Sequence, residues 1–309
     1  MKKEALSPRQ LSVAVLTGGM SAAAAAAGRA DWRWLLAAGA LGVLLGWLLL
    51  RRVGGRALHP VLRWLYAGWA VVLMAETLGR SAERLHQGAG AVGGAGWLMV
   101  LLALPLLWMG WGGGTAFFRA VEIFWLAALA ATAAILLLGL PRVDWRWVLE
   151  PGGGWEESLA GAAGILSAGL FTLPQLYNVK EEPGGIRRGL VWLGALACVS
   201  AALSALTAGL LSPAVAAQVE GPFFVAAGLL GDSARLEGLV SALWLLPDLT
   251  LAGLLSRSWG ERRWPALGAA LALALALTGA AEGLPVWTPA LGTAALAALT
   301  AAFPLGEKK

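Results

Sequence analysis

The chain is dominated by long apolar runs, and these constrain its fold more than any other feature of the sequence. Of its 309 residues, 59% are hydrophobic and only 13% are charged, whereas about one quarter of a soluble domain is charged. Inside a bilayer each backbone N–H and C=O needs a partner within its own segment, so apolar runs that span it form helices. Charged or Gly/Pro-rich breaks separate ten candidate spans, at residues 11–27, 34–50, 61–78, 95–111, 120–140, 159–176, 190–211, 239–255, 265–280 and 286–303.

The sequence therefore predicts an all-α polytopic membrane protein with ten transmembrane helices in a single transmembrane domain, residues 1–309. The longest polar stretches, residues 142–158 and 212–237, have the length of loops or surface helices rather than of a separate soluble domain. With one cysteine and two histidines, the chain lacks the residues of a disulfide framework, a thiolate cluster or a histidine-rich metal site. We expect no metal and no cofactor.

Basic residues gather on one side of the predicted topology. With the N-terminus inside and ten spans, 16 of the 23 Lys and Arg residues fall on the inner face. By the positive-inside rule, this split predicts that both termini are cytoplasmic. We therefore expect the positive charge to face the cytoplasm and anionic lipid, and we expect no nucleic-acid partner. An alternative interpretation of residues 1–27 is a cleaved signal peptide, because a basic start precedes an apolar stretch and an Ala-rich run.

Ten spans divide into two halves of five, about residues 7–140 and 155–304. Because five is odd, the second half enters the membrane from the opposite face, which is the arrangement of an inverted repeat. Folds of this kind bind their ligand where the first helix of each half is broken, so we expect helices 1 and 6 to be broken. The first span carries Thr17-Gly18-Gly19-Met20-Ser21 at its middle, and the sixth carries Gly161, Gly164, Ser167 and Gly169.

Both segments are rich in glycine, which tolerates non-helical backbone and so frees amides and carbonyls for a ligand. A helix N-terminus favours a carboxylate and a C-terminus favours an ammonium, so the expected ligand is a small amino acid or a similar zwitterion. The alternative is that these small residues let neighbouring helices pack closely. The residues predicted to bind the ligand are Thr17, Gly18, Gly19, Met20, Ser21, Gly164, Ser167 and Gly169.

Asp248 is an acidic residue in the middle of an apolar span, where it follows Pro247. A carboxylate is expensive at this depth and usually faces a cavity or a partner. We expect Asp248 either to stay protonated or to hold a cation or a hydrogen-bond donor. The alternative is a purely structural acid, neutral and hydrogen-bonded beside the kink that Pro247 produces.

The remaining polar positions give weaker signals. Arg119 and Glu122 stand three apart on one helical face, which favours a structural ion pair at the cytoplasmic boundary over a gate. The chain carries no HExxH and no GxSxG motif, and its glycine-rich runs lack the Lys-Ser/Thr of a phosphate loop. We therefore expect that the protein is not an enzyme.

Several short motifs occur in an order that is similar to that of a known family. Those in the first half are Leu6-Ser7-Pro8-Arg9-Gln10-Leu11, Ala30-Asp31-Trp32, and Arg119 with Glu122. Those that follow are Val143-Asp144, Leu149-Glu150-Pro151, Leu173-Pro174, Pro222-Phe223, Arg235-Leu236-Glu237 and Trp244. Together they resemble the spore germination permeases, which are the B subunits of nutrient germinant receptors and belong to the amino acid–polyamine–organocation superfamily. The resemblance extends from residue 6 to about residue 250.

This resemblance implies a transporter-like fold in the cytoplasmic (spore inner) membrane. It also implies that the protein senses an amino-acid germinant together with A- and C-type receptor subunits. In this superfamily the eighth span lies near the ion site, which makes Asp248 and Thr250 candidates for holding a proton or a cation. Two alternatives stay open: a proton- or sodium-coupled amino acid transporter, and a structural membrane subunit that binds no ligand.

Overall fold

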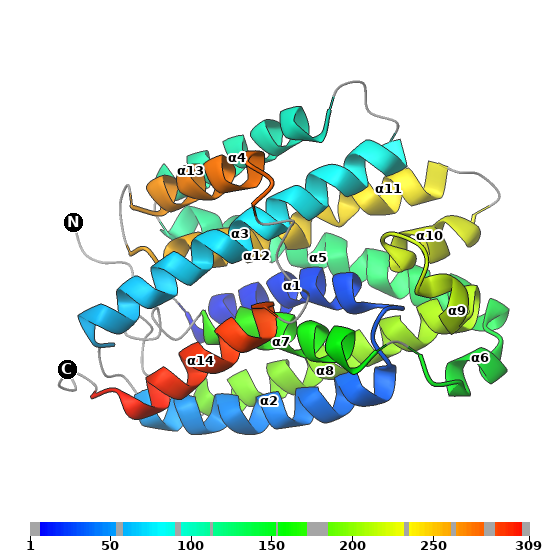
Figure 1. Ribbon diagram of the computed structural model, residues 1–309, viewed down its shortest axis with the longest axis horizontal. Coiled ribbons are helices and arrows are strands. Elements are labelled where there is room, and N and C mark those ends of the chain that lie inside the picture. Colours follow the sequence, from blue (N-terminus) through cyan, green and yellow to red (C-terminus); the bar gives the residue numbers. More distant parts are fainter. Residues whose placement is uncertain are drawn as a thin grey trace.

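The computed structural model of the chain is a bundle of helices that run mostly along its long axis (Figure 1). It describes residues 7–53, 58–89, 94–111, 114–152, 154–171, 185–231, 235–260, 264–280 and 288–304, in which no strand occurs. Its elements are α1 (Pro8–Ala26), α2 (Trp32–Val53), α3 (Pro60–Ala89), α4 (Ala95–Trp111), α5 (Gly114–Gly139), the 3₁₀ turn η1 (Leu140–Arg142), α6 (Trp145–Leu149), α7 (Trp155–Leu170), α8 (Gly185–Leu211), α9 (Pro213–Ala216), α10 (Pro222–Leu229), α11 (Arg235–Leu243), α12 (Leu245–Arg257), α13 (Trp264–Leu277) and α14 (Thr288–Ala302).

Helices occupy all of the predicted apolar ranges, as far as the described residues extend. Within the described residues, four helical stretches are each long and apolar enough to cross a membrane, and several shorter apolar helices accompany them. The protein is therefore an all-α integral membrane protein. The four long stretches are Pro60–Gly88, Ala116–Arg142, Val191–Leu211 and Leu236–Arg257.

α3 continues well beyond the predicted span at residues 61–78 and ends at Ala89. The apolar run stops earlier because charged residues follow it, but Glu and Arg are good helix formers and no proline interrupts the segment. Hydropathy thus marks the end of the apolar surface, whereas the backbone hydrogen bonds continue. The extra turns place Ser81 and Arg84 on a helix instead of in the predicted outer loop.

The eighth predicted span is divided between α11 and α12 at Trp244. Pro247 has no N–H to donate to the carbonyl of Leu243, which weakens the helix at this point. The chain keeps a helical path, because Trp244 N–H donates to Val240 (2.9 Å) and Asp248 N–H donates to Trp244 (3.3 Å). Asp248 consequently lies in the first turn of α12.

α1 lies at the centre of the bundle, where it packs against α5, α7, α8 and α12. Two large apolar clusters lie within the bundle. One is built mainly from α3, α4, α12 and α13, and the other mainly from α1, α8 and α10. The contact between α1 and α12 therefore lies between the two clusters.

The prediction of a broken first helix is wrong, because α1 is continuous from Pro8 to Ala26. Glycine in a helix costs about 1 kcal/mol relative to alanine, but here the close approach of neighbouring helices compensates for that cost. α7 is likewise continuous from Trp155 to Leu170. The predicted Leu173-Pro174 end of the sixth span lies outside the described residues.

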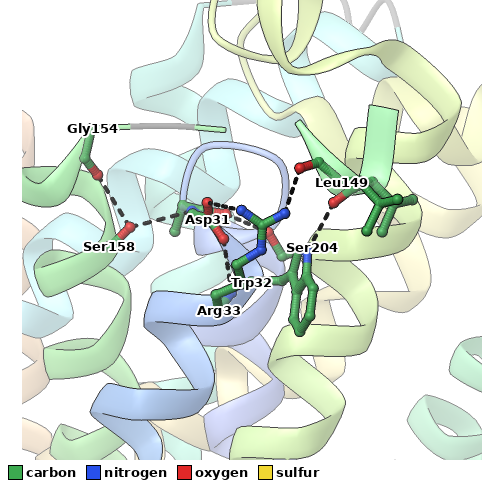
Figure 2. A network of polar contacts seen from close by, with 9 residues as sticks. Asp31, Trp32, Arg33, Leu149, Gly154, Ser158 and Ser204 are labelled. Atoms are coloured by element: carbon green, nitrogen blue, oxygen red, sulfur yellow. Dashed lines mark hydrogen bonds and ion pairs between the residues drawn. The ribbon is translucent and has the colours of Figure 1, made fainter. Parts of the chain in front are cut away.

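A polar network fixes the connection between α1 and α2 to the later helices (Figure 2). Asp31 N–H donates to Ser158 Oγ (3.2 Å), and the Asp31 carboxylate accepts the backbone N–H of Arg33 (2.8 Å). Arg33 Nη2 donates to the carbonyl of Leu149 (2.5 Å), and Ser204 Oγ donates to the carbonyl of Ala30 (2.5 Å). Most of these contacts satisfy backbone groups of loops and helix ends, so the role of the network is structural.

Candidate functional site

The Asp248 carboxylate lies in the interior of the bundle, and the residue is only 4% exposed. Ser21 Oγ of α1 donates to Oδ1 at 2.5 Å. Arg84 Nη2 of α3 donates to Oδ2 at 2.5 Å. Ser81 Oγ of α3 lies 2.7 Å from the same oxygen and 2.7 Å from the carbonyl of Thr77, so its single proton is shared between these two acceptors. Three helices therefore meet at one carboxylate. We call Ser21, Ser81, Arg84 and Asp248 the Asp248 centre.

The Asp248 centre contains a buried ion pair. The side chains of Asp248 and Arg84 are 6% and 12% exposed. A carboxylate with a guanidinium, the hydroxyl donor of Ser21 and a shared proton from Ser81 has the partners that a buried charge requires. The structure gives Asp248 hydrogen-bond donors, which both the functional and the purely structural interpretation of the sequence include. Removal of either partner from such a pair is strongly destabilising, because it leaves an uncompensated charge.

Sequence reasoning missed Ser81 and Arg84 because both follow the apolar run of the third span. A signal for them was present, since Thr77, Ser81 and Arg84 stand at positions i, i+4 and i+7, which share one face of a helix. Ser21 was predicted as a ligand-binding residue. The structure instead pairs it with Asp248, 227 positions later in the chain.

Aromatic side chains cover the Asp248 centre on the side of α10. The guanidinium carbon of Arg84 lies 4.4 Å from the ring centroid of Phe224. The rings of Phe224 and Trp244 are in edge contact, 6.2 Å between centroids, and Trp244 Nε1 donates to the backbone carbonyl of Met20 at 3.2 Å. Because Met20 precedes Ser21, these contacts connect α10, the α11–α12 junction and α1 around one carboxylate.

A small pocket adjoins Asp248 between α3, α4 and α12, with room for about one water molecule. Its polar wall comes from Asp248, Thr77 and Ser81. Its other walls are apolar, so the pocket suits a small group that is partly polar and partly apolar. The apolar lining residues are Leu78, Leu102, Leu106, Leu245, Leu249 and Ala252.

In this structure, three of the α1 residues predicted to bind the ligand are engaged within the fold. The Thr17 hydroxyl donates to the carbonyl of Val13 at 2.8 Å. A Cβ at Gly18 would lie 3.2 Å from Leu251 Cα in α12, and a Cβ at Gly19 would clash with the side chain of Leu196 in α8. These contacts favour the alternative in which the glycines allow close helix packing.

The predicted residues of the sixth span have similar surroundings. A Cβ at Gly164 would lie 3.0 Å from the Cβ of Ala22, and one at Gly169 would lie 2.9 Å from Leu193 Cδ2. Ser167 Oγ donates to the carbonyl of Ala163 (2.7 Å), so Thr293 is the donor in its second hydrogen bond (2.9 Å). At these positions α7 is in contact with α1, α8 and α14.

Two further sets of predicted residues, Thr250 with Asp248 and Arg119 with Glu122, have other surroundings than the sequence suggests. The Thr250 hydroxyl donates to the carbonyl of Leu246 at 2.8 Å, and in the described part of the chain it does not bind Asp248. Arg119 is exposed and Glu122 is half-buried, and within the described residues no ion pair joins them. The pair of Arg119 and Glu122 that the sequence predicts is therefore not formed in this structure. An exposed pair gains little, because holding two long side chains in one geometry costs conformational entropy.

No protein-family model matches this chain, and no curated protein matches its sequence. The resemblance to the spore germination permeases therefore rests on the sequence motifs. Two motif positions have clear structural roles, since Asp31 anchors the start of α2 and Trp244 binds α1.

Proposed function

We propose that the protein is a membrane-embedded subunit that senses a small amino acid, as the B-type subunit of a spore germinant receptor. In this proposal it acts with A- and C-type subunits in the cytoplasmic (spore inner) membrane. The observation that carries the proposal is the buried ion pair of the Asp248 centre, which connects α1, α3 and α12. Ionisable residues inside a membrane protein are costly and therefore usually functional.

Helix contacts support a ten-span, five-plus-five inverted repeat as part of this proposal. α1 packs against α7, α2 against α8, α3 against α12 and α4 against α13. These are the first four pairs of helices that such a repeat would relate. A transporter-like fold built in this way places its ligand site at the interface of the two repeats.

The ends of the helices support an even number of spans with both termini on one face. Arg52 Nη2, near the end of α2, donates to the carbonyl of Phe303, just after α14, at 3.4 Å. In Figure 1 the start of α1 and the end of α14 also lie toward the same end of the bundle. Together with the excess of basic residues on that face, this arrangement favours cytoplasmic termini.

Sensing follows from the position of the ion pair. A ligand that binds better to one arrangement of α1, α3 and α12 shifts the population toward that arrangement. Partner subunits in contact with these helices then detect the shift. The Asp248 centre suits this role because a single carboxylate joins three helices.

The same centre favours sensing over cation-coupled transport. A coupling carboxylate needs to bind and release a proton or a cation. Asp248 already has the guanidinium of Arg84 as its counter-ion and a hydroxyl group at hydrogen-bond distance from each oxygen. Thr250, the other predicted ion ligand, donates within its own helix.

The test is a pair of measurements on the purified full chain. Calorimetric titration against a panel of small amino acids should detect binding of at least one of them. Proteoliposomes that contain the protein should not accumulate that amino acid, with or without a pH or sodium gradient. Gradient-driven accumulation would establish the transporter alternative, and absence of both binding and uptake would establish the structural-subunit alternative.

A further inference from the structure

The charges of the Asp248 centre match those of a zwitterion. Arg84 and Asp248 supply one positive and one negative charge, and both are largely buried. A cation or an anion that entered alone would leave an uncompensated charge in apolar surroundings, which is strongly unfavourable. A zwitterion that inserts between the two side chains brings an opposite charge to each, so every buried charge keeps a partner.

Arg84 has donor capacity left for a ligand carboxylate. A guanidinium offers five N–H donors in a planar fork that matches a carboxylate. Nη2 binds Asp248, whereas Nε is buried and has no acceptor among the described residues. The ring of Phe224, 4.4 Å from the guanidinium carbon, orients the group from one face. An arriving carboxylate would therefore meet an oriented, partly unsatisfied donor group.

Asp248 keeps polar support when Arg84 turns to a ligand. Ser21 donates a hydroxyl hydrogen bond to Oδ1, and the Ser81 hydroxyl, whose proton is shared with the carbonyl of Thr77, lies at Oδ2. The ammonium group of the ligand then replaces Arg84 as the charged partner of Asp248. The exchange leaves the carboxylate with a cation and the same two hydroxyl groups.

The adjoining pocket limits the side chain of the ligand. Its volume is that of about one water molecule, which is also close to the size of a methyl group. Asp248 forms part of its wall, and the apolar side chains that line it include Leu102, Leu106 and Ala252. An amino acid whose ammonium binds Asp248 can thus place a hydrogen or a methyl group in this pocket.

We propose that a small zwitterionic α-amino acid of the size of glycine or alanine inserts between Arg84 and Asp248. Its carboxylate binds Arg84, its ammonium binds Asp248, and its side chain occupies the pocket between α3, α4 and α12. This inference rests on the proposed sensing function and names its ligand site. The site differs from the cleft between the first and sixth spans that the glycine pattern predicted.

Calorimetric titration of the purified full chain tests the charge requirement. Wild-type protein should bind glycine or alanine, but not ethylamine or propionate, which each carry one of the two charges. Arg84→Gln should weaken binding by about 30-fold or more, since it truncates one member of a buried charge pair. The matched control is Arg80→Gln, one turn earlier on α3, where the arginine pairs with Glu76 at 3.4 Å. Its affinity should stay within about 3-fold of wild type.

A double variant keeps the test valid if Arg84→Gln fails to fold. Arg84→Gln combined with Asp248→Asn removes both charges, so neither is left unpaired. This variant should fold, as judged by its size-exclusion profile and helical circular dichroism, and should bind neither glycine nor alanine. Binding by the double variant at wild-type affinity would overturn the proposed site.

Variants of the pocket test the size requirement. Ala252→Val reduces the space, so it should retain glycine binding and lose alanine binding. Leu102→Ala enlarges the space, so it should admit larger aliphatic amino acids such as valine. Unchanged selectivity in both variants would place the side chain of the ligand elsewhere and overturn this part of the proposal.

The outcomes separate this site from the proposed function. If wild-type protein binds glycine or alanine, and Arg84→Gln binds them as tightly as the control Arg80→Gln does, the proposed site is wrong and the sensing function stands. If wild-type protein binds no amino acid of the panel, the sensing function fails and this site fails with it.

Discussion

Arg84 Nη2 lies 2.5 Å from Asp248 Oδ2, although the two residues are 164 positions apart in the sequence. One charge comes from the late turns of α3 and the other from the first turn of α12. Each compensates the other in the interior of the bundle, so α3 and α12 cannot separate there without leaving an unpaired charge, unless a ligand supplies new partners.

Replacing either member of this pair alone should lower the free energy of unfolding. Replacing both together should lower it by less than the sum of the two single effects. Asp248→Asn leaves Arg84 without its counter-ion, so we expect a loss of about 3–5 kcal/mol in the free energy of unfolding. Arg84→Gln should have a similar effect, and the double variant should recover a large part of the loss. Denaturant titrations in detergent measure all three variants. Strictly additive effects, within about 0.5 kcal/mol, would show that the two side chains do not interact.

Gly18 should tolerate no larger side chain. A Cβ there would lie 3.2 Å from the backbone of Leu251, which cannot move aside as a flexible side chain can. We expect Gly18→Val to lower the free energy of unfolding by about 1–3 kcal/mol. Gly68→Ala is the matched control, because no atom lies within 4 Å of its Cβ position, and it should stabilise α3 by about 0.5–1 kcal/mol. Wild-type stability in Gly18→Val, with loss of amino-acid binding, would instead support the predicted ligand cleft at α1.

Phe224 should stabilise the protein partly through Arg84. The guanidinium faces its ring, so we expect a coupling free energy of about 0.5–2 kcal/mol between Phe224→Leu and Arg84→Gln. Phe223→Leu provides the control. Its ring packs on Trp244 with centroids 4.7 Å apart, and in the described residues it makes no contact with the Arg84 guanidinium. Equal coupling for both phenylalanines would mean that the ring–guanidinium contact adds nothing specific.

Reporter fusions should place the ends of α2 and α14 on the same side of the membrane. The hydrogen bond from Arg52 to the carbonyl of Phe303 requires this, and the excess of basic residues predicts that this side is cytoplasmic. We expect cytoplasmic signals from reporters inserted after Arg52 and fused after Lys309, and an external signal from one inserted at Glu220. Opposite results at Arg52 and Lys309 would exclude an even number of spans.

The positions of the helices were largely predictable because long apolar runs leave the backbone one way to satisfy its hydrogen bonds in a bilayer. The far end of α3 was not predictable from hydropathy, since charged residues continue a helix as readily as apolar ones. The glycines at Gly18 and Gly19 were ambiguous for a related reason. Glycine permits both unwound backbone and close packing, and only the neighbouring atoms of Leu251 and Leu196 distinguish the two.

The sequence by itself determined that the chain is an all-α membrane protein, because its long apolar runs are visible without any structure. It also marked Asp248 as a candidate functional residue, since a carboxylate in the middle of an apolar span is costly. Only the tertiary structure decided what Asp248 binds. Its partners Ser21, Ser81 and Arg84 stand 227, 167 and 164 positions away, on helices whose mutual rotation depends on how their side chains pack. The spacing of apolar residues along the sequence reveals which face of a single helix is buried. Which residues of three different helices meet at one carboxylate depends on how the helices pack against each other.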